Sequence, residues 1–240
     1  MDNAGYTTLT RQSGLLREMQ VVANNIANMS TAGYRAEGVV FTEHVRALEG
    51  AADSLSMASA SGRRISAAQG ALERTGSPFH MAIEGVGFFL VETPEGEALT
   101  RAGNFLRSDT GELVTPDGHR LLDAGGAPVF APPEADSIAL AQDGTLSADG
   151  QPLTRIGLWQ PVDPTALTRA PGALFTADGG VQPARGGIML QGMVEGSNVD
   201  PVSQIARMIE VQRAYEMGQS FLDSEHERTR DFLRTAGARQ

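Results

Sequence analysis

The sequence predicts an α+β protein in which amphipathic helices at both termini form a coiled-coil-like domain around a central, mostly antiparallel β-rich domain. Apolar residues near both ends recur at three- and four-residue spacing, which is the period of a helix with one buried face. Between the ends, short apolar runs alternate with glycine and Asp-Gly pairs, which supply the tight turns of antiparallel hairpins. We therefore expect four segments, residues 1–34, 35–80, 81–190 and 191–240.

The first segment contains the N-terminal helix, expected over about residues 4–29. Its apolar face comprises Leu9, Leu15, Leu16, Met19, Val22 and Ile26. Asn24, Asn25 and Asn28 interrupt this pattern near the helix end. Two interpretations of these amides stay open, because asparagine is common at helix ends and can also form hydrogen bonds across a helix pair that fix its register.

The connector at residues 35–80 is expected to be partly extended. Phe41, Val45 and Leu48 have a spacing that is compatible with a short helix. Residues 50–62 are rich in alanine and serine, which is typical of a loop or an extended connector.

The β-rich prediction for residues 81–190 depends on turn signals. Phe88 to Val91 form a strand-like run that ends at a Pro-Glu-Gly turn. Asp-Gly pairs then recur, starting at Asp117, Asp143, Asp149 and Asp178. Because no strand–helix–strand alternation is visible, the pattern favours antiparallel pairing.

The C-terminal segment switches back to a helical pattern after Asp200 and Pro201, which are suited to the N-cap and to the first helical position. A continuous helix from there would be about 50 Å long. Its apolar stripe comprises Val202, Ile205, Met208, Ile209, Val211, Tyr215, Leu222, Phe232 and Leu233.

Composition excludes several function classes. The net charge of −10, from 19 basic and 29 acidic residues, disfavours general affinity for nucleic acid or anionic lipid. The absence of cysteine excludes disulfides, thiolate metal sites and cysteine nucleophiles. We expect no cleaved signal peptide, lipid anchor or membrane span, because no long apolar run is present.

An enzyme is not expected, and neither is a metal or cofactor. The four histidines, at positions 44, 80, 119 and 226, have no metal-ligand spacing. Gly85 and Gly87 precede two phenylalanines, so the dinucleotide fingerprint lacks its third glycine. The chain contains no lysine, which rules out a phosphate-binding loop of the Walker type, and it has no nucleophile elbow.

The periodicity leaves the partner of the terminal helices open. The two helices would either fold into a private hairpin on a monomeric β-rich binding module, or expose apolar surface that other subunits cover in an open filament.

Sequence motifs resemble those of a known family. Residues 23–28 and 30–35, Ala-Asn-Asn-Ile-Ala-Asn and Ser-Thr-Ala-Gly-Tyr-Arg, resemble the N-terminal signature of bacterial flagellar rod and hook proteins. Residues 191–202 with 208–216 resemble the C-terminal signature, and residues 85–89, 100–105 and 111–115 resemble the shared β-domain. The resemblance covers nearly the whole chain in the family's order.

Within the family, the opening residues 2–6, 11–12 and 16–18 are most similar to proximal-rod members, with distal-rod members as the close alternative. Met29, Ser30 and Tyr34 are mild departures from the N-terminal signature.

The resemblance implies a structural subunit of the proximal rod that transmits torque from motor to hook. Both termini would form a coiled-coil inner assembly domain, and residues 81–190 an outer domain. The protein would be exported through the flagellar type III apparatus without a cleaved signal, and would polymerise into the axial rod across the periplasm with copies of itself and other rod proteins.

The resemblance also implies a mechanism based on packing. Leu16, Met19, Val22 and Ile26 would meet Val202, Ile205, Ile209 and Leu222, with Leu9 and Tyr215 on the same stripes. Asn24, Asn25, Asn28 and Asn198 would fix register or contact neighbouring subunits.

Overall fold

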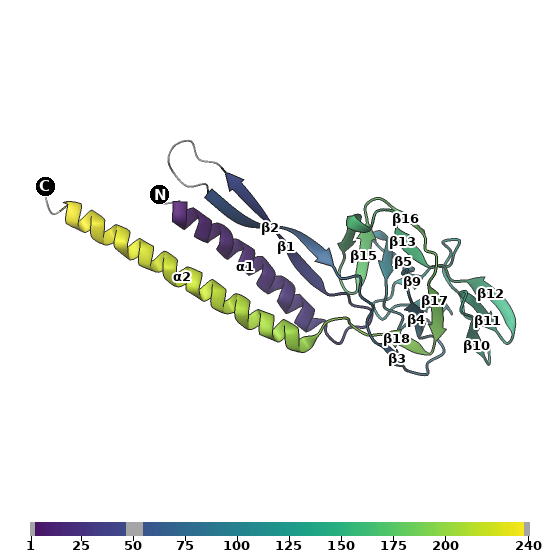
Figure 1. Cartoon of the computed structure of the whole chain (residues 1–240). Coiled ribbons are helices and arrows are strands. Elements are labelled where there is room, and N and C mark those ends of the chain that lie inside the picture. Colours follow the sequence, from purple (N-terminus) through teal and green to yellow (C-terminus); the bar gives the residue numbers. More distant parts are fainter. Residues whose placement is uncertain (1–2, 47–54, 238–240) are drawn as a thin grey trace. The chain divides into compact units, whose positions relative to one another are not determined.

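The computed structural model describes residues 3–46 and 55–237 (Figure 1). The chain divides into two units. The helical unit comprises Met1–Ala27, Ala36–Ser66 and Asp200–Gln240, and the β unit comprises Asn28–Arg35 and Ala67–Val199. The prediction of an α+β fold, with one helix at each end and antiparallel strands between them, is confirmed.

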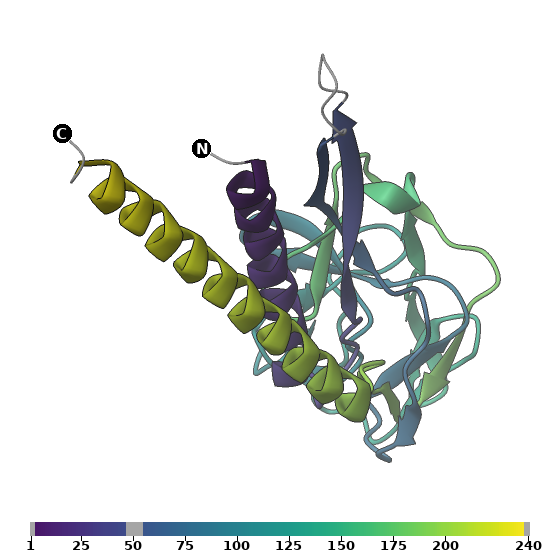
Figure 2. The same cartoon turned by 60° about the vertical axis from the view of Figure 1, so that its left-hand side comes forward.

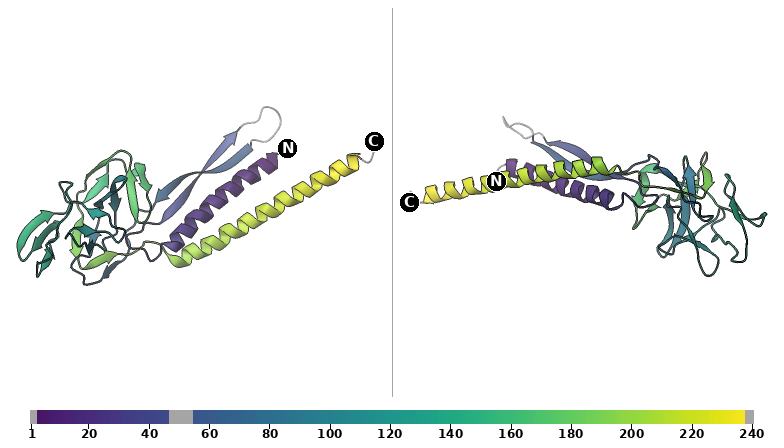
Figure 3. Two further views of the ribbon diagram at one scale, coloured as in Figure 1. Left: turned by 180° about the vertical axis from the view of Figure 1, so that it is seen from behind. Right: turned by 90° about the horizontal axis from the view of Figure 1, so that it is seen from below.

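Two helices form the largest part of the helical unit. α1 spans Asn3–Ala27 and α2 spans Pro201–Gly237, so their lengths are about 37 Å and 55 Å. They lie side by side and run in opposite directions (Figure 3), and α2 continues past the level at which α1 begins.

The α2 helix begins where the sequence places its N-cap. The carboxylate of Asp200 accepts hydrogen bonds from the backbone N–H groups of Val202 and Ser203 and from the Ser203 hydroxyl. Pro201 occupies the first helical position, where a missing N–H costs nothing.

A two-stranded antiparallel hairpin completes the helical unit. It consists of β1 (Glu37–Arg46) and β2 (Leu55–Ile65), with a register shift between Val40 and Phe41. The short helix considered for Phe41 and Val45 is therefore wrong, while Leu48 lies outside the described residues. An isolated hairpin is marginally stable in water, but both strands here pack against α1 (Figure 2).

The β unit contains only antiparallel strand pairs among its described residues. Its largest sheet has seven strands, in the order β14 (Leu167–Arg169), β15 (Leu174–Ala177), β6 (Gly96–Thr100), β5 (Phe89–Thr93), β9 (Arg120–Leu121), β8 (Leu113–Val114) and β7 (Leu106–Arg107). A three-stranded sheet contains β10 (Ile138–Leu140), β11 (Thr145–Ala148) and β12 (Gln151–Arg155).

Three further strand pairs complete this unit. They are β13 (Trp159–Pro161) with β16 (Val181–Pro183), β17 (Ile188–Gln191) with β4 (Met81–Glu84), and β18 (Met193–Glu195) with β3 (Leu72–Arg74). A short 3₁₀ helix, η1, spans Pro164–Ala166. Strand pairing in the unit thus begins at Leu72 and ends at Glu195, with β3 and β18 lying next to each other.

The core of the β unit is built from aliphatic side chains and a few phenylalanines. Phe89 and Phe105 pack edge to face with their ring centroids 5.3 Å apart, a favoured aromatic geometry. The surrounding buried residues include Met81, Ile83, Val91, Leu113, Leu121, Leu146 and Ile156. Phe175 is the third buried phenylalanine of this unit, so aliphatic side chains fill most of its interior.

Candidate functional site

Asn25 connects three elements of the helical unit. The side chain is buried; its Nδ2 donates to the Glu37 carbonyl oxygen at 2.8 Å, and its Oδ1 accepts from the Glu37 N–H at 2.9 Å. The Asn25 amide therefore bonds both the N–H and the carbonyl oxygen of Glu37, as a residue on a neighbouring antiparallel strand would do at the start of β1. The same Nδ2 donates to Gln204 Oε1 on α2 at 3.1 Å.

An ion pair joins the two helices one turn further along. Arg207 Nη2 on α2 lies 2.5 Å from Glu18 Oε1 on α1, and Arg207 Nη1 lies 3.1 Å from Glu210 Oε2. The hydrogen bond that Arg207 donates to the Glu18 carboxylate raises the pKa of Arg207 above its ordinary value, because it stabilises the charged guanidinium. Glu18 is buried while Arg207 is half exposed, so water screens part of this attraction.

A third contact between the helices packs the Gln12 side chain against Gly218 of α2. Gln12 Nε2 donates to the Tyr215 carbonyl oxygen at 2.9 Å. A Cβ at Gly218 would lie 2.6 Å from the same nitrogen, so a larger residue there would displace Gln12. These contacts pair positions 25, 18 and 12 of α1 with positions 204, 207 and 215 of α2, which fixes one antiparallel register.

The apolar residues singled out by the sequence are divided between the interior and the surface of the helical unit. Val22 is buried together with Val21 and Val211. Four more are partly buried, namely Met19, Ile26, Tyr215 and Leu222. Five are exposed, namely Leu9, Leu16, Val202, Ile205 and Ile209.

The remaining predicted asparagines differ in their surroundings. Asn24 is exposed on α1. In the β unit, Asn28 Oδ1 accepts a hydrogen bond from the Thr31 hydroxyl at 3.1 Å. Asn198 Nδ2 donates to the Ala68 carbonyl oxygen at 2.6 Å, and its backbone N–H donates to the Tyr34 carbonyl oxygen at 3.2 Å.

The β unit also contains a buried ionic cluster that the sequence analysis did not find. Glu195 is only 1% exposed, and its two carboxylate oxygens lie 3.1 Å from Arg35 Nη2 and 3.0 Å from Arg101 Nη1. The Gly70 N–H also donates to this carboxylate, at 3.0 Å. We call Arg35, Arg101 and Glu195 the arginine–glutamate cluster.

Backbone carbonyl oxygens accept further hydrogen bonds from both arginines of the arginine–glutamate cluster. Arg35 Nη1 donates to the carbonyls of Ala67 and Ala68, both at 2.6 Å. Arg101 donates to Ile83 O at 3.2 Å and Gly85 O at 2.5 Å. Burial lowers the pKa of Arg101 to about 10 despite the attraction of Glu195, and it lowers the pKa of Arg35 in the same direction.

The segment around Arg35 is held by close packing as well as by charge. Tyr34 is 2% exposed, and the Arg169 guanidinium carbon lies 4.2 Å from its ring centroid, within the range of a cation–π contact. Arg169 also donates to the Arg35 carbonyl oxygen. Gly33 has φ of +66°, and a Cβ there would lie 2.1 Å from the backbone nitrogen of Ala102.

Three sequence motifs therefore meet at one place in the β unit. Arg35 ends the N-terminal signature, Arg101 lies in the 100–105 motif, and Glu195 lies in the C-terminal signature. The Gly33 N–H also donates to the Glu195 carbonyl oxygen at 2.7 Å. The one signal in the sequence was the opposite charge of Arg35, at the end of the N-terminal signature, and Glu195, near the start of the C-terminal signature.

Comparisons with known proteins agree with this arrangement of motifs. Residues 6–35 match the family model described as flagella basal body rod protein, and residues 190–234 match the C-terminal model of flagellar basal body rod FlgEFG proteins. Residues 82–148 match the D1 domain of flagellar hook protein FlgE/F/G. The chain is 36% identical to the flagellar basal-body rod protein FlgF of Caulobacter vibrioides, over 99% of both chains.

The chain belongs to the flagellar basal-body rod protein family. It is also 36% identical to FlgF of Mesorhizobium japonicum, over the full length of both chains, and 34% identical to FlgG of Caulobacter vibrioides, over 90% of this chain and 93% of that one. The regions matched by the three family models contain Arg101, Glu195 and Arg35 respectively, so the arginine–glutamate cluster joins the three matched regions of this chain.

Within residues 3–46 and 55–237, no three histidine, cysteine or acidic side chains are grouped as a metal site would need. Neither described helix has an apolar stretch long enough to cross a membrane.

Proposed function

We propose that this chain is a structural subunit of the proximal flagellar rod, as its similarity to FlgF proteins suggests, and that it carries out no catalytic step. It polymerises with copies of itself and with other rod proteins through α1 and α2, which pack in a coiled-coil-like manner. The assembled rod carries torque from motor to hook in the periplasm, after export of the chain by the type III apparatus without a cleaved signal.

The observation that carries this proposal is the exposed apolar face of α2. Val202, Ile205 and Ile209 are 76%, 51% and 45% exposed in the single chain, although their spacing places them on one side of the helix. Further along α2, Met217, Phe221 and Phe232 are also exposed. A chain in which a private helical hairpin buries its own stripes would cover these side chains.

Exposed apolar surface of this kind favours assembly because its removal from water stabilises the contact by about 25 cal/mol per Å². Subunits that use two different patches, head to tail, form open filaments. A monomeric β-rich binding module is the weaker alternative, because a monomer would leave the apolar face of α2 exposed to water. FlgG-type rod proteins are a second alternative, supported by the lower but extensive similarity to them.

The test replaces exposed apolar residues without disturbing the buried contacts of the helix pair. The double variant Ile205→Asp/Ile209→Asp is expressed in a strain that lacks its own copy of the gene, and Gln219→Asp is the matched control on an exposed polar position of α2. We expect the double variant to keep its helical circular dichroism and to be absent from purified basal bodies, with loss of motility. Wild-type motility of the double variant would refute assembly through this face.

A further inference from the structure

The β unit contains a groove that is lined by residues of this unit alone. It has a volume of about 670 Å³ and is formed by the turn after β10, the segment from the end of β12 into β13, and the residues between β16 and β17. Its apolar lining includes Leu158, Trp159, Pro183 and Ile188. This volume falls within the range of ligand-binding clefts.

The groove contains a hydrogen-bond donor without an acceptor. The indole Nε1 of Trp159 is buried and has no hydrogen-bond partner among the described residues. A Cβ at Gly157 would lie 2.8 Å from this nitrogen and 3.0 Å from Ala124 Cα, so the glycine allows the indole to pack closely against the backbone. Because a buried, unpaired N–H is costly, an incoming acceptor at this position would be stabilising.

The rim of the groove is cationic. Arg155 and Arg185 both line it and are exposed. The one acidic side chain of the lining, Asp143, is already engaged, because its two oxygens accept the backbone N–H and the hydroxyl of Thr145, both at 3.0 Å. These bonds lower the pKa of Asp143. Arg155 donates to the Asp143 carbonyl oxygen at 3.1 Å and is attracted by the Asp143 carboxylate, so Arg185 supplies the excess positive charge of the rim. This charge favours an acidic occupant with an apolar side chain.

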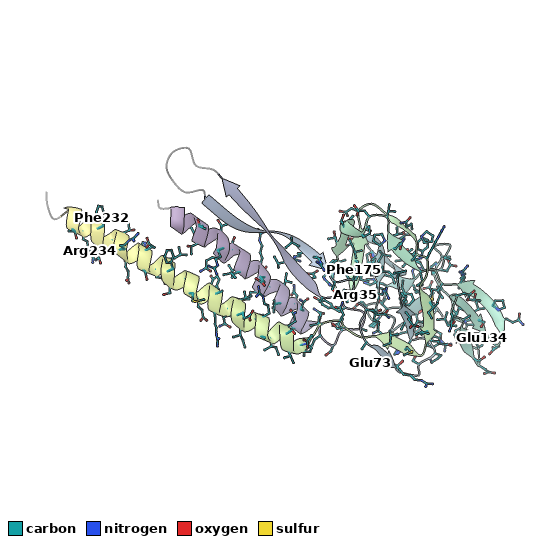
Figure 4. The ribbon with its side chains drawn as sticks, viewed as in Figure 1. Arg35, Glu73, Glu134, Phe175, Phe232 and Arg234 are labelled. Carbon is teal, nitrogen blue, oxygen red and sulfur yellow. The ribbon has the colours of Figure 1, made fainter. Side chains whose placement is uncertain are left out.

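A segment with this chemistry lies elsewhere on the same chain. Residues 130–137 follow the buried Val129 and carry Phe130, which is 47% exposed, together with the exposed carboxylates of Glu134 and Asp136. Figure 4 labels Glu134. We call this segment the acidic turn. Ser137 at its end is fixed by Asp149, whose carboxylate accepts the Ser137 N–H at 2.8 Å.

The acidic turn and the groove lie at opposite ends of one small sheet. The acidic turn leads into the first residue of β10, whereas Gln142 and Asp143 in the turn that follows β10 line the groove. Asp149 belongs to the β11–β12 turn, at the same end as the acidic turn. This separation prevents a chain from filling its own groove with its own acidic turn.

We propose that the groove binds the acidic turn of a second copy of this chain. The carboxylates of Glu134 and Asp136 meet Arg185 and Arg155, and Phe130 supplies the apolar contact. This contact joins unlike patches head to tail, as open assembly requires. It deepens the proposed function and rests on it, since it adds a contact between β units to the contacts made by the helices.

The experiment uses the only tryptophan of the chain as its reporter, because Trp159 lines the groove. A synthetic peptide with the sequence of residues 130–137 is titrated into the full-length monomer while tryptophan emission is recorded. We expect a saturable change in emission with half-saturation below about 1 mM. The Arg185→Glu variant should weaken binding about fivefold or more, because it replaces an attractive rim charge with a repulsive one.

Two controls make the result decisive. A peptide of scrambled order should give no saturable change, and Arg74→Glu, an exposed charge on β3 outside the groove, should bind the native peptide like the unaltered chain. The proposal is overturned if the native peptide produces no change at several millimolar, or if Arg185→Glu binds it with unchanged affinity. Because the titration does not involve α1 or α2, such a failure would leave assembly through the helices standing.

Discussion

Replacing Glu195 by glutamine tests whether the arginine–glutamate cluster holds the two signatures together. The substitution keeps the size of the side chain and removes its charge. Arg35 and Arg101 then lose their shared counterion, at 3.1 Å and 3.0 Å, in a place where Glu195 is 1% exposed. The amide oxygen of glutamine still accepts one hydrogen bond, so most of the loss is electrostatic.

The magnitude follows from the burial of the two guanidinium groups. Removing one partner of a buried ion pair costs about 3–5 kcal/mol, because it leaves a charge without compensation. Here one substitution affects two pairs, but the bonds from both arginines to carbonyl oxygens remain and limit the loss. We therefore expect Glu195→Gln to lower the free energy of unfolding of the β unit by about 3–5 kcal/mol.

The assay is urea unfolding followed by the emission of Trp159, which lies in the same unit. The matched control is Glu73→Gln, because Glu73 is an exposed carboxylate on β3, the strand that pairs with the strand of Glu195. The control should change stability by no more than about 0.5 kcal/mol. A loss below about 1 kcal/mol for Glu195→Gln would refute the claim that this carboxylate compensates two buried charges.

Three further changes have expected outcomes. Gly33→Ala should lower the unfolding free energy by more than about 2 kcal/mol, whereas Gly76→Ala, also at positive φ but with no atom near its Cβ position, should cost about 1 kcal/mol in the same urea assay. Asn25→Ala should lower the unfolding free energy by about 1–3 kcal/mol, because it removes the hydrogen bonds of the Asn25 amide to the backbone N–H and carbonyl of Glu37. The loss should be measurable as faster hydrogen exchange of the Glu37 N–H. Hydrogen bonds, of which the one from the Ser203 hydroxyl has the largest effect, lower the pKa of Asp200 below 3.8. The ionised cap therefore stabilises α2 above that pH, and its contribution is lost as the pH falls through the folded-state pKa. Helical circular dichroism should show an acid-induced loss that an Asp200→Asn variant lacks.

The sequence predicted the terminal helices because their signal is local. The α1 and α2 periodicities and the Asp200 cap each arise within a few consecutive turns. The antiparallel strands of the β unit were predicted for the same reason, since glycine turns mark their ends. What the periodicity did not predict was which apolar residues are buried, because Val22 and Ile205 belong to similar stripes yet only Val22 is covered.

The features that the sequence missed depend on contacts between distant residues. The β1–β2 hairpin has little alternation in its serine- and alanine-rich second strand, so packing against α1 and capping by Asn25 determine it more than local preference does. The pairs of Glu195 with Arg35 and Arg101 join positions that are far apart in the chain, and no local pattern reports such a pair.

The central claim is that neighbouring subunits cover the exposed face of α2 in the rod. Because the chain has no native cysteine, Ile209→Cys introduces a single thiol on that face, and Asp178→Cys introduces one at a turn of the β unit as a control. Maleimide labelling rates are compared between the free monomer and purified basal bodies. We predict that Cys at 209 labels readily in the monomer and is strongly protected in basal bodies, while the control labels in both; equal labelling of the 209 thiol in both states would contradict the account.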